Sequence, residues 1–377
     1  MKKVLFLIHD LGQGGAEKVL VNLVNNMDYS KFEITVMTLF DYGENRQFLN
    51  KHIKYKTWCK KMIPGNSHLM KLLSPEQLHK LIIKYDYDIE IAYLDGPCAR
   101  VISGCNNPSV KKMVWIHGEQ CTLEQISKPF RTKAETKKCY CQFDRIVCVS
   151  QKVKQVFLQS LHIPVNHEVL YNTNDSDRII NMSRERADEM KIDSNALNLI
   201  GVGKLEKAKG FDRMLRIIKR FKEQGFPVHL YLLGKGDEYI TLKKYAQKND
   251  LVKNVTFLGY QLNPYKFISK CDLFVCASLA EGFSTAATES LIVGTPVCTV
   301  EVSGMREMLG ENNEYGLVVE NNDEALYQGI KRFFEEPGLL AYYAKQAQLR
   351  GKYFSKEKTV HAVEKRLLQL CEGAKND

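Results

Sequence analysis

The segment CDLFVCASLAEGFSTAATESLIVGTP, residues 271–296, decides the fold of the second half of the chain. Residues 272–277 are a short apolar run of the kind that forms a buried parallel strand. After a Glu-Gly-Phe turn, Ser284 or Thr285 can cap a helix, which the Gly-Thr-Pro sequence at 294–296 then ends. The pattern therefore predicts a strand, a turn and a helix, as in an open α/β sheet.

Two carboxylates occupy defined places in this unit. Glu281 lies in the turn after the strand, and Glu289 lies in the following helix. Ligands of open α/β sheets bind in the crevice outside the carboxyl ends of the strands. We therefore predict that the two acids hold one polyhydroxylated ligand at two points, although two solvated acids would have the same spacing.

Length and composition favour two domains. The 377 residues exceed the usual size of one hydrophobic core, and no apolar run is long enough to cross a membrane. The apolar run at the start ends in His9 and Asp10, too early for a signal peptide, so we expect a cytoplasmic protein. The eleven cysteines contain no CxxC pair and are expected to be reduced thiols.

The chain is basic, with a formal net charge of +10, and residues 1–180 hold 25 basic against 18 acidic side chains. One interpretation is peripheral attraction to an anionic membrane that carries a lipid-linked acceptor. The other is a solvated lysine-rich surface. A nucleic-acid partner is not expected, because no nucleic-acid module is present. The two basic clusters are Lys51, Lys54, Lys56, Lys60 and Lys61, and Lys128, Arg131, Lys133, Lys137 and Lys138.

The first half alternates apolar strands with helical patterns, which predicts a doubly wound parallel sheet. A glycine turn at 12–15 precedes a helix and can approach a phosphate, but Glu17 replaces the third glycine of a dinucleotide fingerprint. His117 ends one strand and faces the same crevice, where a lone histidine can be structural or functional. The expected strands are 3–8, 33–39, 88–93, 112–116, 144–149 and 167–171, and the expected helices are 75–84, 124–138 and 151–161.

The second half follows a polar helical linker at 178–195 and repeats the alternation. Lys204 and Lys209 flank a loop after the first strand, where cations can stabilise an anionic leaving group or simply be solvated. The expected strands are 197–202, 228–233, 254–258 and 297–300, and the expected helices are 211–222, 324–334, 339–352 and 356–370.

In their order along the chain, these motifs resemble those of the retaining GT-B glycosyltransferases of family 4 (glycosyl transferases group 1), notably bacterial capsular and exopolysaccharide enzymes. The resemblance is strongest over residues 201–323 and includes Glu281, Glu289 and the following Gly-Thr-Pro-Val. It implies an α/β fold with two Rossmann-like domains facing across a cleft. We expect an acceptor domain at 1–178, a nucleotide-sugar domain at 179–352 and a helix at 353–377 that returns to the first domain.

The resemblance also implies roles for individual residues. Glu281 would hold the transferred sugar, Glu289 the ribose, and Lys204 and Lys209 the diphosphate, although the family usually has Arg at the place of Lys204. Tyr260 would lie near the base, either stacking or packing. The expected catalytic residues are Glu281, His117 and Lys209, and the expected donor-binding residues are Gly15, Lys204, Lys209, Gly236, Tyr260, Glu281, Gly282, Phe283, Ser284, Thr285 and Glu289.

The function that the resemblance implies is transfer of a sugar, with retention of configuration, from a nucleotide sugar to a saccharide or lipid-linked saccharide. We expect a UDP-linked donor, no cofactor and no metal, and we discount Asp175-Ser176-Asp177 as a metal motif. Two alternatives stay open, namely a nucleotide-sugar epimerase of similar fold and a non-catalytic partner subunit.

Overall fold

A computed structural model describes residues 1–62 and 65–372, and its chain divides into two compact units. Unit 1 combines residues 1–173 with the segment from 356 onward, and unit 2 comprises residues 174–355. The sequence placed the boundaries at 178 and 352, a few residues from these positions. The last five residues of the expected segment 353–377 lie outside the described residues.

Unit 1 is built on a seven-stranded parallel sheet in the order β3-β2-β1-β4-β5-β6-β7. The order reverses between β1 and β4, as in a doubly wound sheet. The strands are β1 (Lys2–Ile8), β2 (Phe32–Phe40), β3 (Lys54–Cys59), β4 (Ile89–Ala92), β5 (Lys111–Ile116), β6 (Arg145–Cys148) and β7 (His167–Val169).

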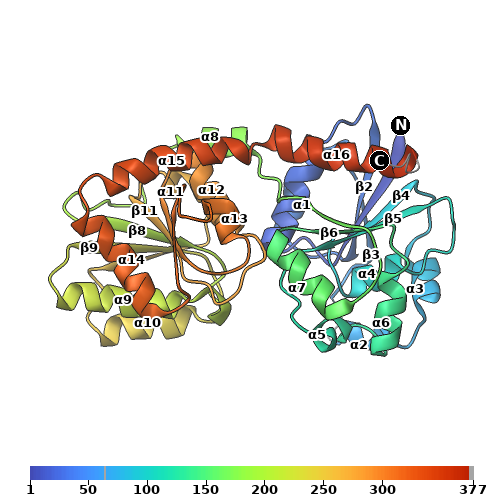
Figure 1. Cartoon of the computed structure of the whole chain (residues 1–377), viewed down its shortest axis with the longest axis horizontal. Coiled ribbons are helices and arrows are strands. Elements are labelled where there is room, and N and C mark those ends of the chain that lie inside the picture. The colour runs from blue at the N-terminus through green and yellow to red at the C-terminus, as the bar shows by residue number, and fades with distance from the viewer. Residues whose placement is uncertain (63–64, 373–377) are drawn as a thin grey trace. The chain divides into compact units, whose positions relative to one another are not determined.

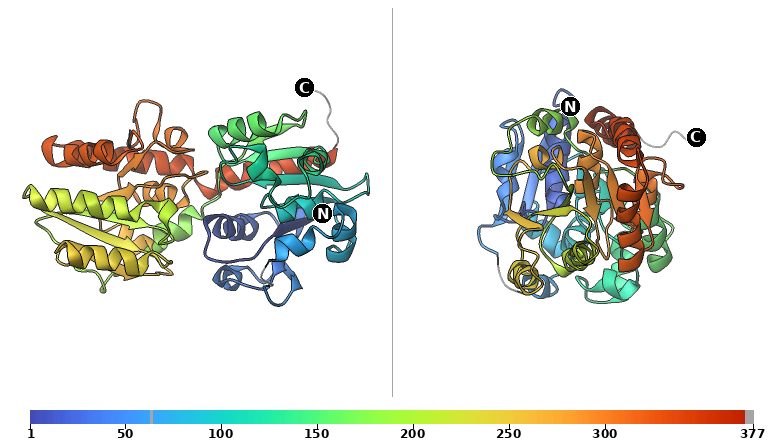
Figure 2. Two further views of the ribbon diagram at one scale, coloured as in Figure 1. Left: turned by 90° about the horizontal axis from the view of Figure 1, so that it is seen from below. Right: turned by 90° about the vertical axis from the view of Figure 1, so that its left-hand side faces the viewer.

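Helices connect these strands, and α16 returns to pack against α1 (Figures 1 and 2). Glu364 of α16 accepts a hydrogen bond from the backbone N–H of Asp28, and Arg366 pairs with Glu168 at 2.7 Å. The helices are α1 (Gly15–Asn26), α2 (Asn66–Met70), α3 (Pro75–Ile82), α4 (Pro97–Ile102), α5 (Leu123–Ser127), α6 (Lys133–Tyr140), α7 (Gln151–Leu161) and α16 (Lys356–Glu372), with a 3₁₀ turn η1 (Glu44–Phe48).

Unit 2 has a six-stranded parallel sheet in the order β10-β9-β8-β11-β12-β13, which reverses between β8 and β11. Figure 1 shows α9, α10 and α14 on one side of this sheet and α8, α11, α12 and α15 on the other. The strands are β8 (Leu197–Val202), β9 (Val228–Leu233), β10 (Val255–Gly259), β11 (Leu273–Cys276), β12 (Val297–Val300) and β13 (Leu317–Val319). The helices are α8 (Ser176–Ser183), α9 (Phe211–Glu223), α10 (Tyr239–Lys248), α11 (Tyr265–Ile268), α12 (Thr285–Val293), α13 (Met305–Leu309), α14 (Asp323–Glu335) and α15 (Leu339–Tyr353), with a 3₁₀ turn η2 (Lys207–Lys209).

The doubly wound α/β fold predicted from the sequence is confirmed, but two local expectations are wrong and one strand was missed. The helix expected at 124–138 is two helices, α5 and α6, on either side of Pro129, whose ring and missing N–H interrupt a helix. The linker expected as a helix over 178–195 is helical only to Ser183. Strand β3 was not expected, because it is a partly exposed edge strand with three polar side chains among six residues.

Within the described residues, no helix is both long enough and apolar enough to span a bilayer.

Candidate active site

The carboxyl ends of β8 and β11 lie next to each other where the strand order of unit 2 reverses. The loops that leave these ends diverge in opposite directions, which opens a crevice at this edge in doubly wound folds. The first loop holds Lys204 and Lys209, and the second holds Glu281. The topology therefore brings the two motifs predicted from the sequence to one place in unit 2.

Lys209 and Glu281 form an ion pair between these two loops. The Lys209 Nζ donates to Glu281 Oε1 at 2.7 Å, and the same oxygen accepts from the Ser278 Oγ at 2.7 Å. The side chains of Lys209 and Glu281 are only 29% and 10% exposed, so the pair is largely shielded from water. Charge-assisted hydrogen bonds of this kind are shorter and stronger than neutral ones.

The environment of Lys209 keeps its ammonium charged. Burial alone would lower the pKa of Lys209, but the charge and hydrogen bond of Glu281 outweigh burial and raise it above its ordinary value. A fixed positive charge is thus present at the carboxyl edge of the sheet. Such a charge can stabilise an anionic leaving group without reorganisation.

Helix α12 begins at Thr285, four residues after Glu281, as the sequence predicted. Ser284 is its N-cap, and its Oγ accepts the backbone N–H of Ala287. Gly282 and Phe283 form the turn, and Phe283 packs against Phe354 with a ring-centroid distance of 5.6 Å. Thr285 is the first helical residue, so the positive end of the helix dipole lies beside Glu281 and favours anionic ligands.

Glu289 lies deeper than Glu281. It is 2% exposed, and one carboxylate oxygen accepts a hydrogen bond from the Tyr265 hydroxyl at 3.3 Å. Tyr265 is the first residue of α11 and is itself buried. The sequence did not indicate this tyrosine, because the contact joins two helices 24 residues apart in the chain.

The glycine loops after β8 and β9 pack closely on each other. A Cβ atom at Gly234, whose φ is +147°, would lie 1.8 Å from the carbonyl oxygen of Gly203. A Cβ at Gly236 would lie 2.3 Å from the carbonyl oxygen of Leu205. Only glycine fits such an approach, so Gly236 shapes the loop that carries the lysines.

Lys204 and Tyr260 are exposed residues among those expected to bind the donor. The side chain of Lys204 is 64% exposed and pairs with Glu206 at 3.2 Å, so the structure does not bring it to Glu281 as it does Lys209. Tyr260 follows β10 and is 40% exposed, with the Lys235 ammonium 5.3 Å from its ring centroid.

In unit 1, the expected glycine turn leads into α1. Gly14 is the N-cap and Gly15 is the first helical residue. A Cβ at Gly14 would lie 2.0 Å from a carboxylate oxygen of Glu17, so this acid closes over the turn. Gly15 itself is exposed.

His117 directly follows β5 at the carboxyl edge of the unit 1 sheet. Burial lowers the pKa of His117 to about 4, although a hydrogen bond with the Tyr93 backbone acts in the opposite direction. Its buried Nε2 atom has no hydrogen-bond partner among the residues that the structure describes. The ring is therefore neutral at physiological pH, and Nε2 can exchange a hydrogen bond with a ligand.

Asp95 is a further polar group at this edge that sequence reasoning missed. It follows β4, and one oxygen accepts a hydrogen bond from the Gln120 Nε2 at 2.8 Å. Burial raises the pKa of Asp95 to about 6. A carboxyl group with such a pKa at a ligand-binding edge is a candidate functional residue, and only its position after a predicted strand signalled it.

Asp175, in the Asp-Ser-Asp sequence, has a structural role. It is the N-cap of α8 and accepts the backbone N–H of Arg178 at 3.3 Å.

The two parallel-sheet units have the fold of the GT-B glycosyltransferases. The model of the Glycosyltransferase Family 4 domain matches residues 13–178, and that of Glycosyl transferases group 1 matches residues 183–350. Together they cover most of the chain, which therefore belongs to this glycosyltransferase family.

Individual relatives agree with the family assignment. The N-acetylgalactosamine-N,N'-diacetylbacillosaminyl-diphospho-undecaprenol 4-alpha-N-acetylgalactosaminyltransferase of Campylobacter jejuni is 30% identical, over 98% of this chain and 100% of its own. An uncharacterised glycosyltransferase of Haemophilus influenzae is 21% identical over 96% of this chain and 98% of its own.

Solved structures share the fold. Anabaena HepE, in complex with UDP and glucose, has a TM-score of 0.76 at 18% identity and covers 97% of this chain and 99% of its own. The sucrose-phosphate synthase of Thermosynechococcus elongatus has a TM-score of 0.78 at 16% identity, over 99% and 100% of the two chains.

Proposed function

We propose that this glycosyltransferase transfers a sugar from a UDP-linked donor, with retention of configuration and without a metal ion, to a saccharide or lipid-linked saccharide in cell-surface polysaccharide synthesis. The observation that carries the proposal is the Lys209–Glu281 pair at the carboxyl edge of the unit 2 sheet. This pair offers one cation for a leaving phosphate and one carboxylate for sugar hydroxyls, side by side.

In this proposal, the donor binds on unit 2. The diphosphate approaches Lys209 and the start of α12, where both the ammonium and the helix dipole favour negative charge. Glu281 accepts hydrogen bonds from hydroxyls of the transferred sugar. Glu289, held by Tyr265, accepts from the ribose, and Tyr260 stacks on the base.

The chemical step needs no protein nucleophile. The bond between the anomeric carbon and the diphosphate oxygen breaks, the acceptor oxygen bonds to that carbon on the same face, and the acceptor proton passes to the departing phosphate. Lys209 stabilises the charge that develops on this phosphate more in the transition state than in the ground state. Neutral His117 would bind a sugar hydroxyl through Nε2, on the acceptor-binding unit.

The relatives support the choice of substrates. HepE binds UDP and glucose, which favours a UDP-linked donor. The C. jejuni relative is named for a diphospho-undecaprenol-linked saccharide and an alpha linkage. Because common UDP-hexoses are alpha-linked, an alpha product would represent retention.

A transfer assay tests the proposal. The purified chain is incubated with a panel of UDP-sugars and undecaprenyl-diphosphate-linked saccharides, with EDTA present, and the product linkage is determined by NMR. We expect UDP release that depends on the acceptor and an alpha-linked product. Release of free epimerised donor without acceptor would identify an epimerase, and the absence of nucleotide binding would identify a non-catalytic subunit.

Replacing the carboxylate tests the site itself. We expect Glu281→Gln to lower kcat by about 100-fold or more, because the sugar loses a charged partner in a shielded site. The stability should change by about 1 kcal/mol, since the amide can still accept from Ser278. The matched control is Glu336→Gln, which removes the exposed pair with Arg332, and equal kcat in both variants would reject the assigned role.

A further inference from the structure

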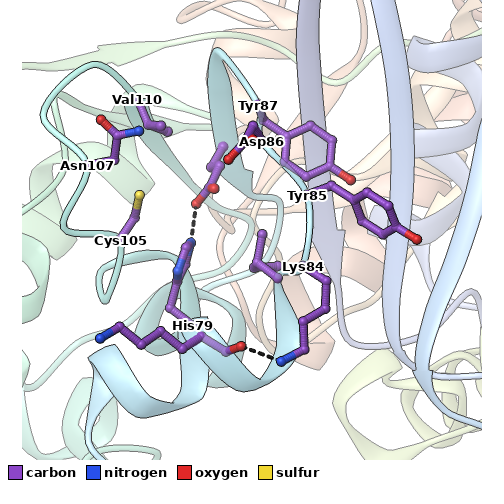
Figure 3. A pocket seen from close by; sticks show the side chains of 11 residues that line it. His79, Lys84, Tyr85, Asp86, Tyr87, Cys105, Asn107 and Val110 are labelled. Atoms are coloured by element: carbon purple, nitrogen blue, oxygen red, sulfur yellow. Dashed lines mark hydrogen bonds and ion pairs between the residues drawn. The ribbon is translucent and has the colours of Figure 1, made fainter.

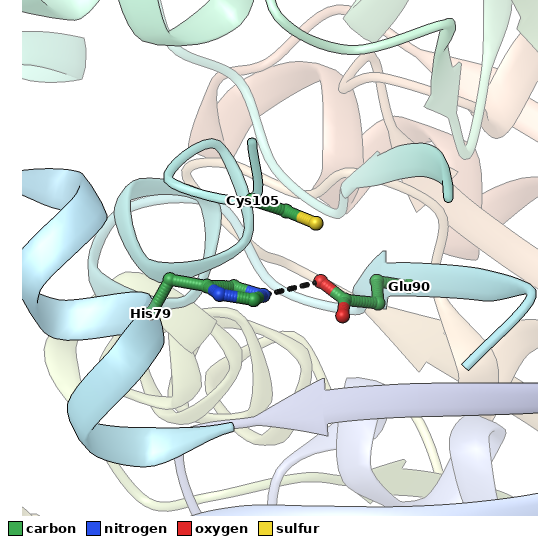
Figure 4. Close-up of side chains that lie close together, drawn as sticks. All are labelled: His79, Glu90 and Cys105. Carbon is green, nitrogen blue, oxygen red and sulfur yellow. Dashed lines mark hydrogen bonds and ion pairs between the residues drawn. The ribbon is translucent and has the colours of Figure 1, made fainter. Parts of the chain in front are cut away.

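Three potential metal ligands of different chemistry meet in unit 1, at the end of the sheet opposite His117 and Asp95. They are His79 in the last turn of α3, Glu90 in β4 and Cys105 after α4. Figure 4 shows the three side chains converging from these separate elements. One ligand atom of each lies within 4.8 Å of the others, and the His79 Nε2 is 2.8 Å from the Glu90 Oε2.

This cluster is not a chance group of surface acids. The side chains of His79 and Glu90 are 15% and 3% exposed, and Cys105 is 4% exposed. Glu90 interrupts the otherwise apolar sequence of β4, an interior strand of a parallel sheet. A buried carboxylate is costly unless it is paired or binds a cation, and His79 is the partner that Glu90 has in this structure.

A pocket of about 380 Å³ opens onto the cluster. Figure 3 shows it lined by His79 and Cys105, by Tyr85 and Tyr87 of the loop before β4, and by Asn107. A ligand atom can therefore reach the cluster from solvent. Catalytic and exchangeable metal sites keep an open position of this kind, whereas purely structural sites are closed.

We infer that His79, Glu90 and Cys105 form a zinc-binding site whose fourth position opens to this pocket. A thiolate, an imidazole and a carboxylate suit Zn²⁺, whereas Mg²⁺ and Ca²⁺ prefer oxygen ligands alone. Tetrahedral Zn²⁺ places its ligand atoms roughly 3.3 to 3.8 Å apart. The three ligand atoms now lie within 4.8 Å of one another, so zinc binding would require their side chains to readjust to such separations.

The charges balance when zinc binds. Zn²⁺ takes the places of the protons on the Cys105 thiol and the His79 imidazole, which are released to water. The ion with one thiolate and one carboxylate is neutral. It therefore adds no net charge beside the buried ammonium of Lys112, whose Nζ donates to the Cys105 carbonyl oxygen at 3.0 Å.

The site would fasten α3, β4 and the end of α4 to one another. It is separate from the proposed transfer chemistry, because it lies at the amino end of β4 while His117 and Asp95 lie at the carboxyl ends of the strands. Because its fourth position is open, zinc should bind exchangeably and stabilise unit 1 while bound, without taking part in sugar transfer.

Metal binding to the full chain tests the inference directly. The protein is first treated with a chelator and desalted. It is then titrated with Zn²⁺ in competition with a chromophoric chelator, and separately with Co²⁺ while the absorption spectrum is recorded. We expect one saturable site, a thiolate-to-cobalt charge-transfer band and a higher Tm with Zn²⁺. Absence of saturable binding by the wild-type chain would overturn the inference without any variant.

Two conservative variants separate ligation from a structural His–Glu pair. Cys105→Ser keeps the side-chain shape, and His79→Gln keeps a donor for Glu90. Loss of a residue that only hydrogen-bonds to a metal ligand typically weakens metal binding by roughly 10–100-fold. Each of these variants removes a ligand and should weaken Zn²⁺ binding by more than that. Cys105→Ser should also abolish the charge-transfer band. The control is Cys121→Ser, at an exposed thiol, and equal loss in the control would show adventitious thiol binding instead.

Discussion

At the scale of residues, the two lysines of the β8 loop have different environments despite their similar place in the sequence. Lys209 is held by Glu281 at 2.7 Å, whereas Lys204 is mostly exposed and pairs with Glu206. A preorganised cation contributes more to a transition state than one that must first be ordered. The diphosphate should therefore depend mainly on Lys209.

Substitution of each lysine tests this difference. Lys209→Met should lower kcat by about 100-fold or more, because the leaving phosphate loses its preorganised partner. Lys204→Met should lower kcat by less than about 10-fold, as expected of an exposed pair. Steady-state kinetics and UDP affinity by calorimetry measure both effects, and equal losses would contradict the assignment.

The second residue-scale prediction concerns the pH dependence of stability. The unfolded state binds a proton at His117 as the pH falls through about 6.5, but the folded state does not until about 4. The contribution of His117 to the free energy of unfolding is therefore fully present above pH 6.5 and is lost as the pH falls towards 4. The pKa difference corresponds to about 3 kcal/mol.

Urea unfolding of the wild type and of His117→Asn measures this contribution. Between pH 7.5 and 4.5, the wild type should lose up to about 3 kcal/mol more than the variant. Parallel pH profiles for the two proteins would show that the histidine is not buried in its neutral form.

The sequence predicted which residues end the strands, but not which of them touch. Glu281 and Lys209 could be placed at one edge because parallel strands share their carboxyl ends. The hydrogen bonds of Asp95 with Gln120 and of Glu289 with Tyr265 join segments 25 and 24 residues apart. Such pairs depend on tertiary packing, which periodicity and spacing do not determine.

At the scale of elements, the loops after β8 and β9 depend on one close backbone approach. A side chain at Gly234 would overlap the Gly203 carbonyl and would also occupy a φ of +147°, which L-residues rarely adopt. The β8 loop carries Lys209, so displacement of this contact should also move the lysine.

Gly234→Ala should therefore destabilise the protein by about 2 kcal/mol or more and reduce UDP binding. Gly225→Ala is the matched control, because Gly225 also has a positive φ, +76°, but no atom lies within 4 Å of the added Cβ. Thermal unfolding and calorimetry compare the two. If Gly225→Ala destabilises the protein as much as Gly234→Ala does, the effect comes from backbone strain alone and not from the overlap with Gly203.

Elements were predictable where burial and capping signals agreed. Strands β8, β9 and β12 and helices α7 and α12 have the predicted bounds, since apolar runs are bounded by residues that stop or start an element. Strand β3 escaped prediction because it is largely unburied and lysine-rich, and its pairing with β2 is set by the sheet rather than by its own sequence.

At the scale of the whole molecule, the excess of positive charge in the first half can serve a membrane contact or solubility. Some of these cations are already engaged, since Lys54 pairs with Glu33 and Arg131 donates to backbone carbonyls of Lys71 and Leu72. Lys60 and Lys61, just after β3, are exposed, and so is the neighbouring Met62. Exposed cations beside an apolar side chain suit an anionic lipid surface, where each contributes about 1 kcal/mol.

Flotation with vesicles distinguishes the two interpretations. If the membrane contact exists, the chain should bind vesicles rich in anionic lipid and be released at about 0.5 M salt, because the Debye length then falls to a few ångströms. Reversing both charges, with Lys60→Glu and Lys61→Glu, should weaken binding by about 10-fold or more. The matched control carries the same charge reversals at Lys243 and Lys244, which are exposed in unit 2. The two double variants therefore have the same net charge. Equal weakening by both pairs would mean that only net charge matters, and the absence of binding by the wild type would leave the lysines as a solvated surface.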